Sequence, residues 1–303
     1  LISSLNARLW RYIKNLSKQE KLIRKIMPKT KNILSVDFED YFCDLPFSKW
    51  NEYENRVVET TPILLELFSK YSVKATFFVV GYFAEKFPKL INEIQDGGHE
   101  IASHSFSHID LRKVSKDEIE KDLVKSFNVI ESVTGEKVLG FRAPFFSIDN
   151  SNSWILNFLR KHIKYDSSIF PVKSPLYGVP NAPRVMYHPS KENFLKNDEN
   201  EELIEIPPLT NRIFSLYNLP VAGGFYFRAL PYFLISQGIR KFNDNDMPAM
   251  LYFHPKDLDK NMPKIKQYTW HYYYGKRNIV AKFEKLLKDF KFTSVRDFFD
   301  FKN

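Results

Sequence analysis

The sequence is short of cysteine. One of its 303 residues is a cysteine, Cys43, which excludes an internal disulfide framework and a zinc site built from cysteines. A reducing compartment is therefore compatible with the chain. Long apolar runs are lacking too, since none approaches the roughly eighteen residues that a membrane-spanning helix needs. The opening stretch has neither a compact apolar core nor a small-residue cleavage site, so we expect no signal peptide.

Sequence motifs of nucleic-acid-binding proteins are also missing. The formal net charge of +9 favours an anionic partner, such as a phospholipid surface, a charged glycan or a nucleic acid. The chain has no zinc-finger spacing, no aromatic RNA-recognition motif and no block of lysine and arginine of the nucleic-acid type. We therefore expect no nucleic-acid partner.

Hydrophobic residues make up 44% of the chain, which is enough for a folded protein with a large core. Residues 1–30 form a separate basic extension, in which apolar and basic side chains recur at helical spacing up to Pro28. Such a helix can lie on an anionic membrane surface. The interpretation that we prefer is a helix packed across the main domain, residues 31–303, with its charges in water.

From residue 32 onward, apolar runs alternate with helical segments. Runs such as Asn32–Phe38 and Lys74–Gly81 are apolar along almost their whole length, as strands buried on both faces are. A capping box, Ser115 with Glu118, opens one of the helical segments between such runs. Strands that alternate with helices predict βαβ units and a parallel sheet, and hence an α/β fold.

The stretch GHEIASHSFSHIDL, residues 98–111, places His104 and His108 four residues apart after a short apolar run. If this segment turns helically after the strand, both imidazoles project from one face. Two histidines and a carboxylate from elsewhere make a three-ligand metal site with an open position for water. A pair at this spacing is also common as two surface histidines, so the pair alone leaves both interpretations open.

Ionisable residues also end other predicted strands. The five strand ends carry Asp37, Glu39 and Asp40 at the first, then His104, Arg142, Asp166 and His254. In a parallel barrel, the carboxyl ends of the strands converge on one mouth. Two histidines and a carboxylate suit zinc, a second carboxylate can accept a proton from water, and a distant histidine can protonate a leaving amine. The set predicts metal-assisted amide hydrolysis.

These motifs resemble those of NodB-homology polysaccharide deacetylases, carbohydrate esterase family four. The resemblance is nearest to the branch linked to exopolysaccharide loci, which has an additional C-terminal region, here about residues 205–303. The matching segments are SVDFEDYF, GHEIASHSFSH, GFRAPFFSI, YDSSIFP, YGVPNAPR, LPVAGGFYFR and LYFHPKDLD. The resemblance implies a distorted (β/α) barrel of seven or eight parallel strands.

The resemblance also implies a role for each residue of the site. Its metal ligands would be Asp40, His104 and His108, and the ion Zn²⁺ or another divalent metal such as Co²⁺, Ni²⁺ or Mn²⁺. Glu39 would be the general base and Arg142 would hold it in place. The backbone N–H near Phe145 would bind the oxyanion. His254 would be the general acid, tuned by Asp166.

One departure from the family pattern concerns the acidic pair. Typical members have two aspartates, whereas this chain has Glu39-Asp40, with Asp37 two residues earlier. On a strand, Asp37 and Glu39 share one face and Asp40 takes the other, so the chain must turn to bring Glu39 and Asp40 together. Glu39 is preferred as the base because the closer branch tolerates Glu here, and Asp37 remains the alternative.

Three further residues are candidates for substrate contact. Gly224 belongs to a Gly-Gly pair that suggests a tight loop with close backbone approach. His271 and Tyr272 lie in the aromatic segment WHYYYG, whose rings can pack on a sugar or simply on one another.

The expected function is removal of N-acetyl groups from amino sugars of a surface or exported polysaccharide, or of its precursor. The substrate partner is thus an N-acetylated glycan. Two alternatives are another hydrolase on the same scaffold (a deformylase, an O-deacetylase or a cyclic-amide hydrolase) and a catalytically silent glycan-binding protein at a membrane surface. We expect the protein in the cytoplasm or on the cytoplasmic face of the membrane, with envelope association left open.

Overall fold

The computed structural model describes residues 30–213 and 217–302. The basic helix was predicted for residues 1–30, and all of these residues except Thr30 lie outside the described ranges. Residues from Lys31 onward form one compact unit.

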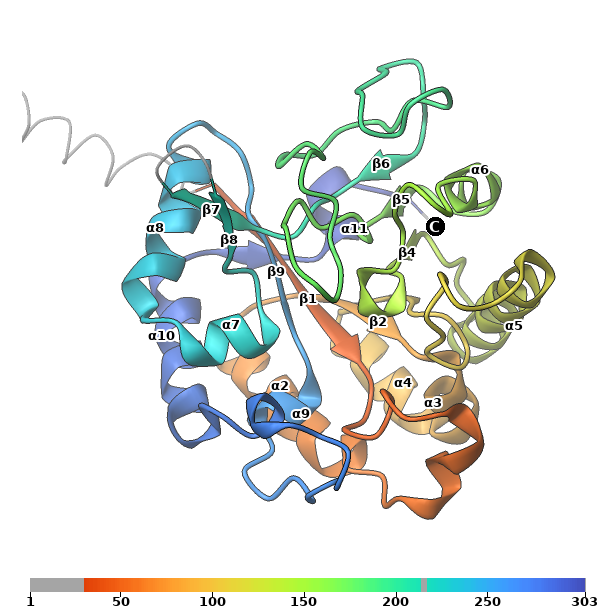
Figure 1. Ribbon diagram of the computed structural model, residues 1–303. Helices are drawn as coiled ribbons and strands as arrows, with labels where there is room; N and C mark the ends of the chain where they lie inside the picture. Colours follow the sequence, from red (N-terminus) through yellow and green to blue (C-terminus); the bar gives the residue numbers. More distant parts are fainter. Residues whose placement is uncertain (1–29, 214–216, 303) are drawn as a thin grey trace, which may run out of the picture. The chain divides into compact units, whose positions relative to one another are not determined.

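Eight parallel strands form the central sheet, in the order β9-β1-β2-β3-β4-β5-β6, with β10 also paired to β1 (Figure 1). Their bounds are β1 (Asn32–Phe38), β2 (Thr76–Val79), β3 (Glu100–Ser103), β4 (Gly140–Phe141), β5 (Tyr165–Asp166), β6 (Ile204–Glu205), β9 (Met250–Phe253) and β10 (Phe292–Thr293). Strands β7 (Thr210–Ile213) and β8 (Tyr217–Pro220) pair antiparallel in a separate two-stranded sheet. The predicted α/β fold with a distorted parallel barrel is confirmed.

Helices surround the sheet and connect successive strands (Figure 1). The α-helices are α2 (Val57–Lys70), α3 (Gly81–Lys86), α4 (Pro88–Asp96), α5 (Lys116–Thr134), α6 (Ile155–Leu159), α7 (Gly224–Ala229), α8 (Tyr232–Asn243), α9 (Pro255–Leu258), α10 (Ile279–Asp289) and α11 (Val295–Phe299). Within the described residues there are also 3-10 helices, namely η1 (Phe47–Glu52), η2 (Pro144–Phe146), η3 (Trp270–Tyr272) and η4 (Lys276–Asn278).

Local sequence signals explain where these helices start and stop. Ser115 caps α5 through the predicted capping box with Glu118, and Gly135, with φ of 70°, ends the helix in a left-handed conformation. Residues 81–96 form two helices and not one, because Pro88 lacks an N–H and begins α4 instead of continuing α3.

Strand β1 is the centre of the sheet. All seven of its residues are buried, and it pairs with β2, β9 and β10. A strand buried on both faces normally carries apolar side chains only, so its buried Ser35 and Asp37 need polar partners. Asp37 lies next to the last residue of β1, at the end of the sheet where the site lies.

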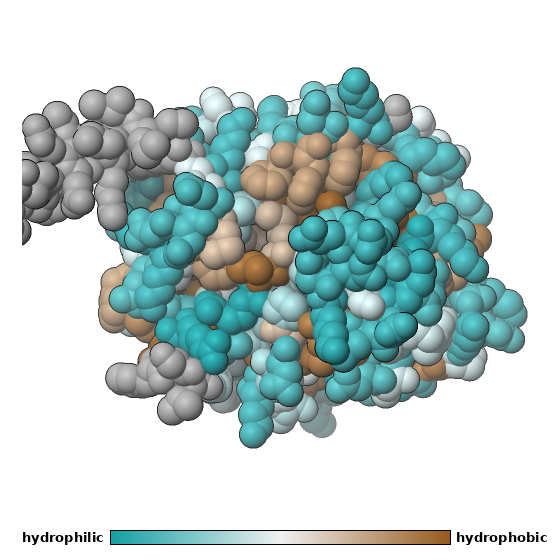
Figure 2. All heavy atoms as spheres, turned by 90° about the horizontal axis from the view of Figure 1, so that it is seen from above, coloured by the Kyte–Doolittle hydropathy of each residue, from teal (hydrophilic) through white to brown (hydrophobic). Residues whose placement is uncertain are grey.

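The surface seen from above is mostly hydrophilic, with scattered apolar patches (Figure 2). Among the helices that the structure describes, none is both long and apolar enough to cross a membrane.

Replacing Gly140 with Ala is expected to lower the free energy of unfolding by about 3 kcal/mol, because overpacking a tight core forces its neighbours to move. A Cβ at this position would lie 2.0 Å from Cζ of the buried Tyr165 ring. Urea denaturation gives the measurement. The control is Gly135→Ala, where no atom lies within 4 Å and left-handed strain alone costs about 1 kcal/mol. Equal losses in the two variants would contradict the close contact.

Candidate functional site

Glu39, His104 and His108 form a buried cluster at the carboxyl end of the sheet. Each offers one ligand atom, and the three atoms lie within 4.8 Å of one another. Glu39 directly follows β1, His104 directly follows β3, and His108 comes from the loop beyond it. Within the described ranges, this is the group of three or more His, Cys, Asp or Glu residues that is suited to a metal ion.

The two imidazoles are oriented by backbone carbonyls. Nδ1 of His104 lies 2.7 Å from the carbonyl oxygen of Arg142, and Nδ1 of His108 lies 3.0 Å from that of Cys43. Because a carbonyl only accepts hydrogen bonds, each Nδ1 carries the proton. Each Nε2 therefore presents a lone pair toward Oε2 of Glu39, at 3.9 Å from His104 and in direct contact with His108.

The loop that carries the histidines is not the helical turn that the spacing predicted. Ser105 and His108 have φ of 61° and 52°, so two left-handed residues bend the chain back toward the site. Asp122 on α5 holds this loop, accepting from the backbone N–H groups of Phe106 at 2.7 Å and Ser107 at 3.1 Å. The two imidazoles converge because of this bend.

Asp40, which the family resemblance assigned as a metal ligand, is not part of the cluster. Its Oδ2 accepts hydrogen bonds from the backbone N–H groups of Arg56 at 2.7 Å and Val57 at 3.1 Å, and its Oδ1 from that of Tyr41 at 2.8 Å. Asp40 thus ties the end of β1 to the first turn of α2. Burial raises its pKa to about 6, against these hydrogen bonds. Glu39 occupies the position expected for Asp40.

The geometry fits a cation. Oε2 of Glu39 is buried without a hydrogen-bond donor, and it faces the lone pairs of two imidazoles. A shared positive ion satisfies all three atoms. Burial lowers the pKa of His104 to about 4, so this ring is neutral and ready to bind at pH 7. Although burial acts against the charged ring, the Glu39 carboxylate raises the pKa of His108, which shows how strongly this position attracts positive charge.

Arg142 was expected to hold Glu39 in place, but it pairs with Asp37 instead. Its Nη1 donates to Oδ1 of Asp37 at 2.6 Å and to Ser35 Oγ at 2.9 Å, and its Nη2 donates to Ser167 Oγ at 2.8 Å. The guanidinium is completely buried and packs over the Phe78 ring. Asp37 is therefore the carboxylate that is held beside the cluster, and this favours it over Glu39 as the base.

His254 follows β9 and points its Nε2 at the two carboxylates. It lies 3.5 Å from Oε1 of Glu39 and 3.8 Å from Oδ2 of Asp37. Its Nδ1 donates to Oδ2 of Asp257 at 2.9 Å, and Arg228 in turn pairs with Asp257 at 3.0 Å. Burial alone would lower the pKa of His254, but Asp257 raises it.

Asp166, which was expected to tune His254, lies elsewhere in the site. Its Oδ1 accepts from Ser168 Oγ at 2.6 Å, and that hydroxyl accepts from the backbone N–H of Ala143. Asp166 therefore supports the backbone beside Arg142. Sequence reasoning missed Asp257, which accepts from the backbone N–H of His254 at 3.1 Å as well as from its ring. Its position three residues after that histidine was the available signal.

Lys256 is a second residue that the sequence did not reveal. Its Nζ donates to Oε1 of Glu39 at 2.6 Å. Burial alone would raise the pKa of Glu39, but His108 and Lys256 hold it well below its usual value. The two oxygens of Glu39 are thus divided, with Oε1 bound by the ammonium group and Oε2 directed at the histidines.

The predicted substrate-binding residues lie around these groups. The Phe145 ring packs 4.7 Å from that of His108, and a Cβ on Gly224 would lie 3.6 Å from Cε1 of His254. The Tyr272 hydroxyl donates to Asp44 at 2.7 Å. The carbonyl of His271 accepts from Arg228, which links this residue to the Asp257–His254 pair. A binding role for each of the four remains a prediction.

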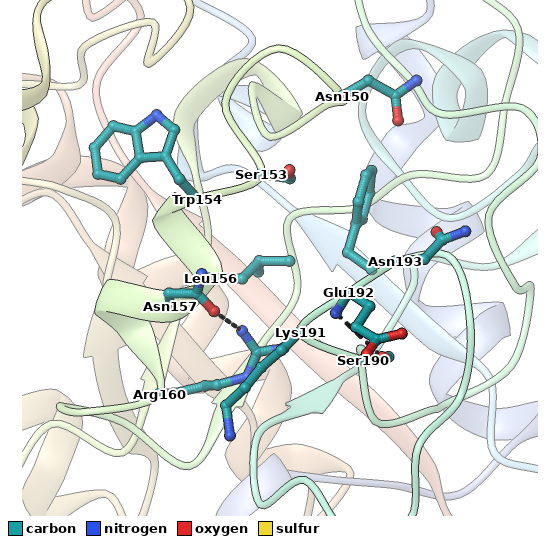
Figure 3. Close-up of a pocket in the computed structure, with 11 residues that line it drawn as sticks. Asn150, Ser153, Trp154, Leu156, Asn157, Arg160, Ser190, Lys191, Glu192 and Asn193 are labelled. Carbon is teal, nitrogen blue, oxygen red and sulfur yellow. Dashed lines mark hydrogen bonds between the residues drawn. The ribbon is translucent and has the colours of Figure 1, made fainter.

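A separate pocket of about 420 Å³ lies between α6 and the loop around residues 190–194 (Figure 3). Its lining is largely polar, and Arg160 donates to Asn157 within it. None of the residues of the cluster lines this pocket.

Two family models match the chain side by side. Residues 44–161 match the model for polysaccharide deacetylase, and residues 167–300 match a domain of unknown function, DUF3473. The first range includes both histidines and Arg142, and the second includes His254. The polysaccharide deacetylase resemblance is thus supported over the histidine-bearing part, while Asp37 and Glu39 precede both ranges.

Curated relatives agree with the first match. The chain is 36% identical over 98 residues to a peptidoglycan-N-acetylglucosamine deacetylase of Bacillus cereus, covering 32% of this chain and 36% of the relative. It is 34% identical over 86 residues to a chitooligosaccharide deacetylase of Azorhizobium caulinodans, covering 28% of this chain and 41% of the relative. The chain spans little more than a third of the length of these relatives.

A solved structure supports the fold. The crystal structure of a Mycobacterium smegmatis protein, provisionally described as a polysaccharide deacetylase, superimposes with a TM-score of 0.57 at 19% identity. The match covers 86% of this chain and 85% of that one.

Replacing Glu39 with Ala is expected to abolish stoichiometric binding of Zn²⁺, because the cluster loses its only carboxylate. Asp40→Ala is the matched control, since it removes the neighbouring acid and leaves the three ligand atoms in place. The second variant should bind the ion but unfold at a lower temperature, through loss of the hydrogen bonds that start α2. Calorimetric titration of the two metal-stripped variants measures ion binding, and thermal denaturation measures the unfolding temperature of Asp40→Ala. The assignment is wrong if Asp40→Ala loses the ion and Glu39→Ala keeps it.

Replacing Asp257 with Asn is expected to lower the pKa of His254, because a neutral amide no longer stabilises the imidazolium. The protonated fraction of His254 at neutral pH would then fall. NMR titration of the histidine ring signals in metal-free protein gives the measurement. Asp166→Asn should leave that titration unchanged, and a shift in this variant alone would restore the original assignment.

Proposed function

We propose that this chain, whose residues 44–161 match polysaccharide deacetylases, is a divalent-metal-dependent hydrolase that removes N-acetyl groups from amino sugars of a polysaccharide or its precursor. The observation that carries the proposal is the buried Glu39, His104 and His108 cluster, flanked by Asp37 and His254. The similarity to deacetylases of peptidoglycan and of chitooligosaccharides supports an N-acetylated glycan as substrate.

Glu39, His104 and His108 would hold the ion. A divalent ion bound there supplies Lewis acidity toward a carbonyl oxygen and lowers the pKa of water. Zn²⁺ suits this set of two imidazoles and one carboxylate, and Co²⁺, Ni²⁺ or Mn²⁺ are other candidates. Because Lys256 occupies Oε1 of Glu39, Oε2 is the oxygen offered to the ion.

Asp37 and His254 carry the two proton transfers. Oδ1 of Asp37 is bound by Arg142, and Oδ2 faces the space between Asp37 and His254, where it can accept the proton of the attacking water. Nε2 of His254 can deliver a proton to the departing amine. Asp257 supports this role because it keeps the imidazolium form populated, and it also fixes the ring.

A finer placement rests on the second match. Residues 167–300 match a family model distinct from that of the deacetylases, and they supply His254. This supports the proposal that the chain falls in the branch linked to exopolysaccharide loci, which the sequence resembles. The glycan would then be an exported polysaccharide.

Replacing His108 with Ala should remove metal binding and acetate release together. Asp37→Asn should keep the ion but lower kcat by a factor of about 100 or more, the usual contribution of a general base. The assay measures acetate and formate released from N-acetylated glycans by metal-stripped and reloaded enzyme.

His162→Ala serves as a control, since this histidine is exposed on the surface and should leave both activity and metal content unchanged. Full activity of metal-stripped protein would overturn the proposed mechanism. Release of formate in place of acetate would assign the chain to the deformylase alternative.

A further inference from the structure

Three aromatic rings cluster on the surface next to the site. The Phe225 ring lies 5.6 Å from that of Trp270 and 6.2 Å from that of Tyr274, and the rings of Trp270 and Tyr274 lie 5.5 Å apart. Trp270 is 66% exposed and Tyr274 is 51% exposed. We call these three residues the aromatic platform. Rings of this size normally bury most of their surface, so such exposure leaves a large apolar area available for a ligand.

Arg228 fixes the platform to the machinery of the site. Its guanidinium donates to three backbone carbonyls of the segment that bears the exposed rings, those of His271 at 3.1 Å, Tyr272 at 3.0 Å and Tyr274 at 2.7 Å. The same guanidinium pairs with Asp257, the partner of His254. One buried cation thus positions both the exposed rings and the proposed general acid.

Two further contacts place the platform close to His254 and to the loop that follows Glu39. Phe225 follows Gly224, on which a Cβ would lie 3.6 Å from Cε1 of His254, so the residue next to the platform lies beside the proposed acid. On the other side, the Tyr272 hydroxyl bonds Asp44, in the loop that follows Glu39. The Tyr272 ring stacks on Tyr268, with centroids 4.0 Å apart, so this ring is occupied by the protein itself. The exposed rings are those of Trp270 and Tyr274, which meet edge to face at an interplanar angle of 90°.

We infer that the aromatic platform is a subsite for a second sugar ring of the glycan, adjoining the sugar whose amide is cleaved. The choice of a sugar follows from the chemistry of the surface. Flat rings stand beside polar groups, namely the Tyr274 hydroxyl and the His271 ring, and this matches a pyranose, which has an apolar C–H face and a hydroxyl edge. That this sugar adjoins the reacting sugar, and is not the reacting sugar itself, rests on the function proposed above.

The subsite gives residues 167–300 a function. This part of the chain matches a domain of unknown function, and it supplies the proposed acid, the residues that position it and all three rings of the platform. We assign to it the selection of chain length, so that a glycan of two or more sugars binds better than a single N-acetylated sugar. The metal ligands play no part in this selection.

The test uses N-acetylglucosamine and its β-1,4-linked oligomers of two to six sugars, with the full chain. Trp270→Ala and Tyr274→Ala should each raise KM for oligomers about tenfold, with kcat and the KM for the monosaccharide unchanged. Trp270→Phe, which keeps a ring, should restore most of the loss. Phe233→Ala is the matched control, because it removes a ring that is 63% exposed on α8, outside the platform.

Binding to the metal-free protein separates this inference from the proposed function. Oligomers should quench tryptophan fluorescence in the wild type, and Trp270→Ala should weaken their binding about tenfold. If oligomers bind in this Trp270-dependent way but no acetate is released, the subsite stands and the deacetylase function fails. If Trp270→Ala and Tyr274→Ala bind and turn over every oligomer like Phe233→Ala, or if no oligomer binds, the subsite is overturned.

Discussion

A carboxylate buried at the end of a parallel strand requires positive charge around it, and the arrangement near Glu39 follows from that requirement. The side chain is 3% exposed, and water cannot stabilise its charge. Lys256 compensates one oxygen, and the two histidines face the other. The ammonium group favours the ionised form of Glu39, so a divalent ion bound at the cluster would not have to displace a proton from this carboxylate. It also occupies Oε1, so Oε2 is the oxygen that Glu39 would offer to an ion.

The parallel topology explains how such distant residues meet. The carboxyl ends of β1, β3, β4 and β9 lie at one edge of the sheet, and each is followed by a polar residue of the site. Asp37 and Glu39 precede both matched regions, His104 and His108 lie in the first, and the proposed acid lies in the second. The residues of the site therefore come together only when β1 pairs with β2 on one side and with β9 on the other. Neither matched region alone contains it.

The sequence predicted the sheet, the Ser115 capping box and the gathering of strand-end residues, because each depends on periodicity or on local hydrogen bonding. Alternation along β1 already placed Asp37 and Glu39 on one face, and the structure agrees with that rule where the family assignment of Asp40 does not. Asp257 and Lys256 were missed because their partners depend on how a short turn after β9 folds back. The three-residue spacing from His254 allows a contact with Asp257, but it does not fix the direction in which the turn folds.

The contact between Asp122 and the histidine loop has a consequence for protein engineering. The loop bends through left-handed residues that carry side chains, a conformation that costs free energy, and a carboxylate on α5 offsets that cost by binding two successive amides. The segment GHEIASHSFSH therefore does not keep this conformation by itself. A designer who grafts it onto another barrel would transfer both imidazoles yet lose their convergence, unless an acidic residue on the following helix were transplanted with it.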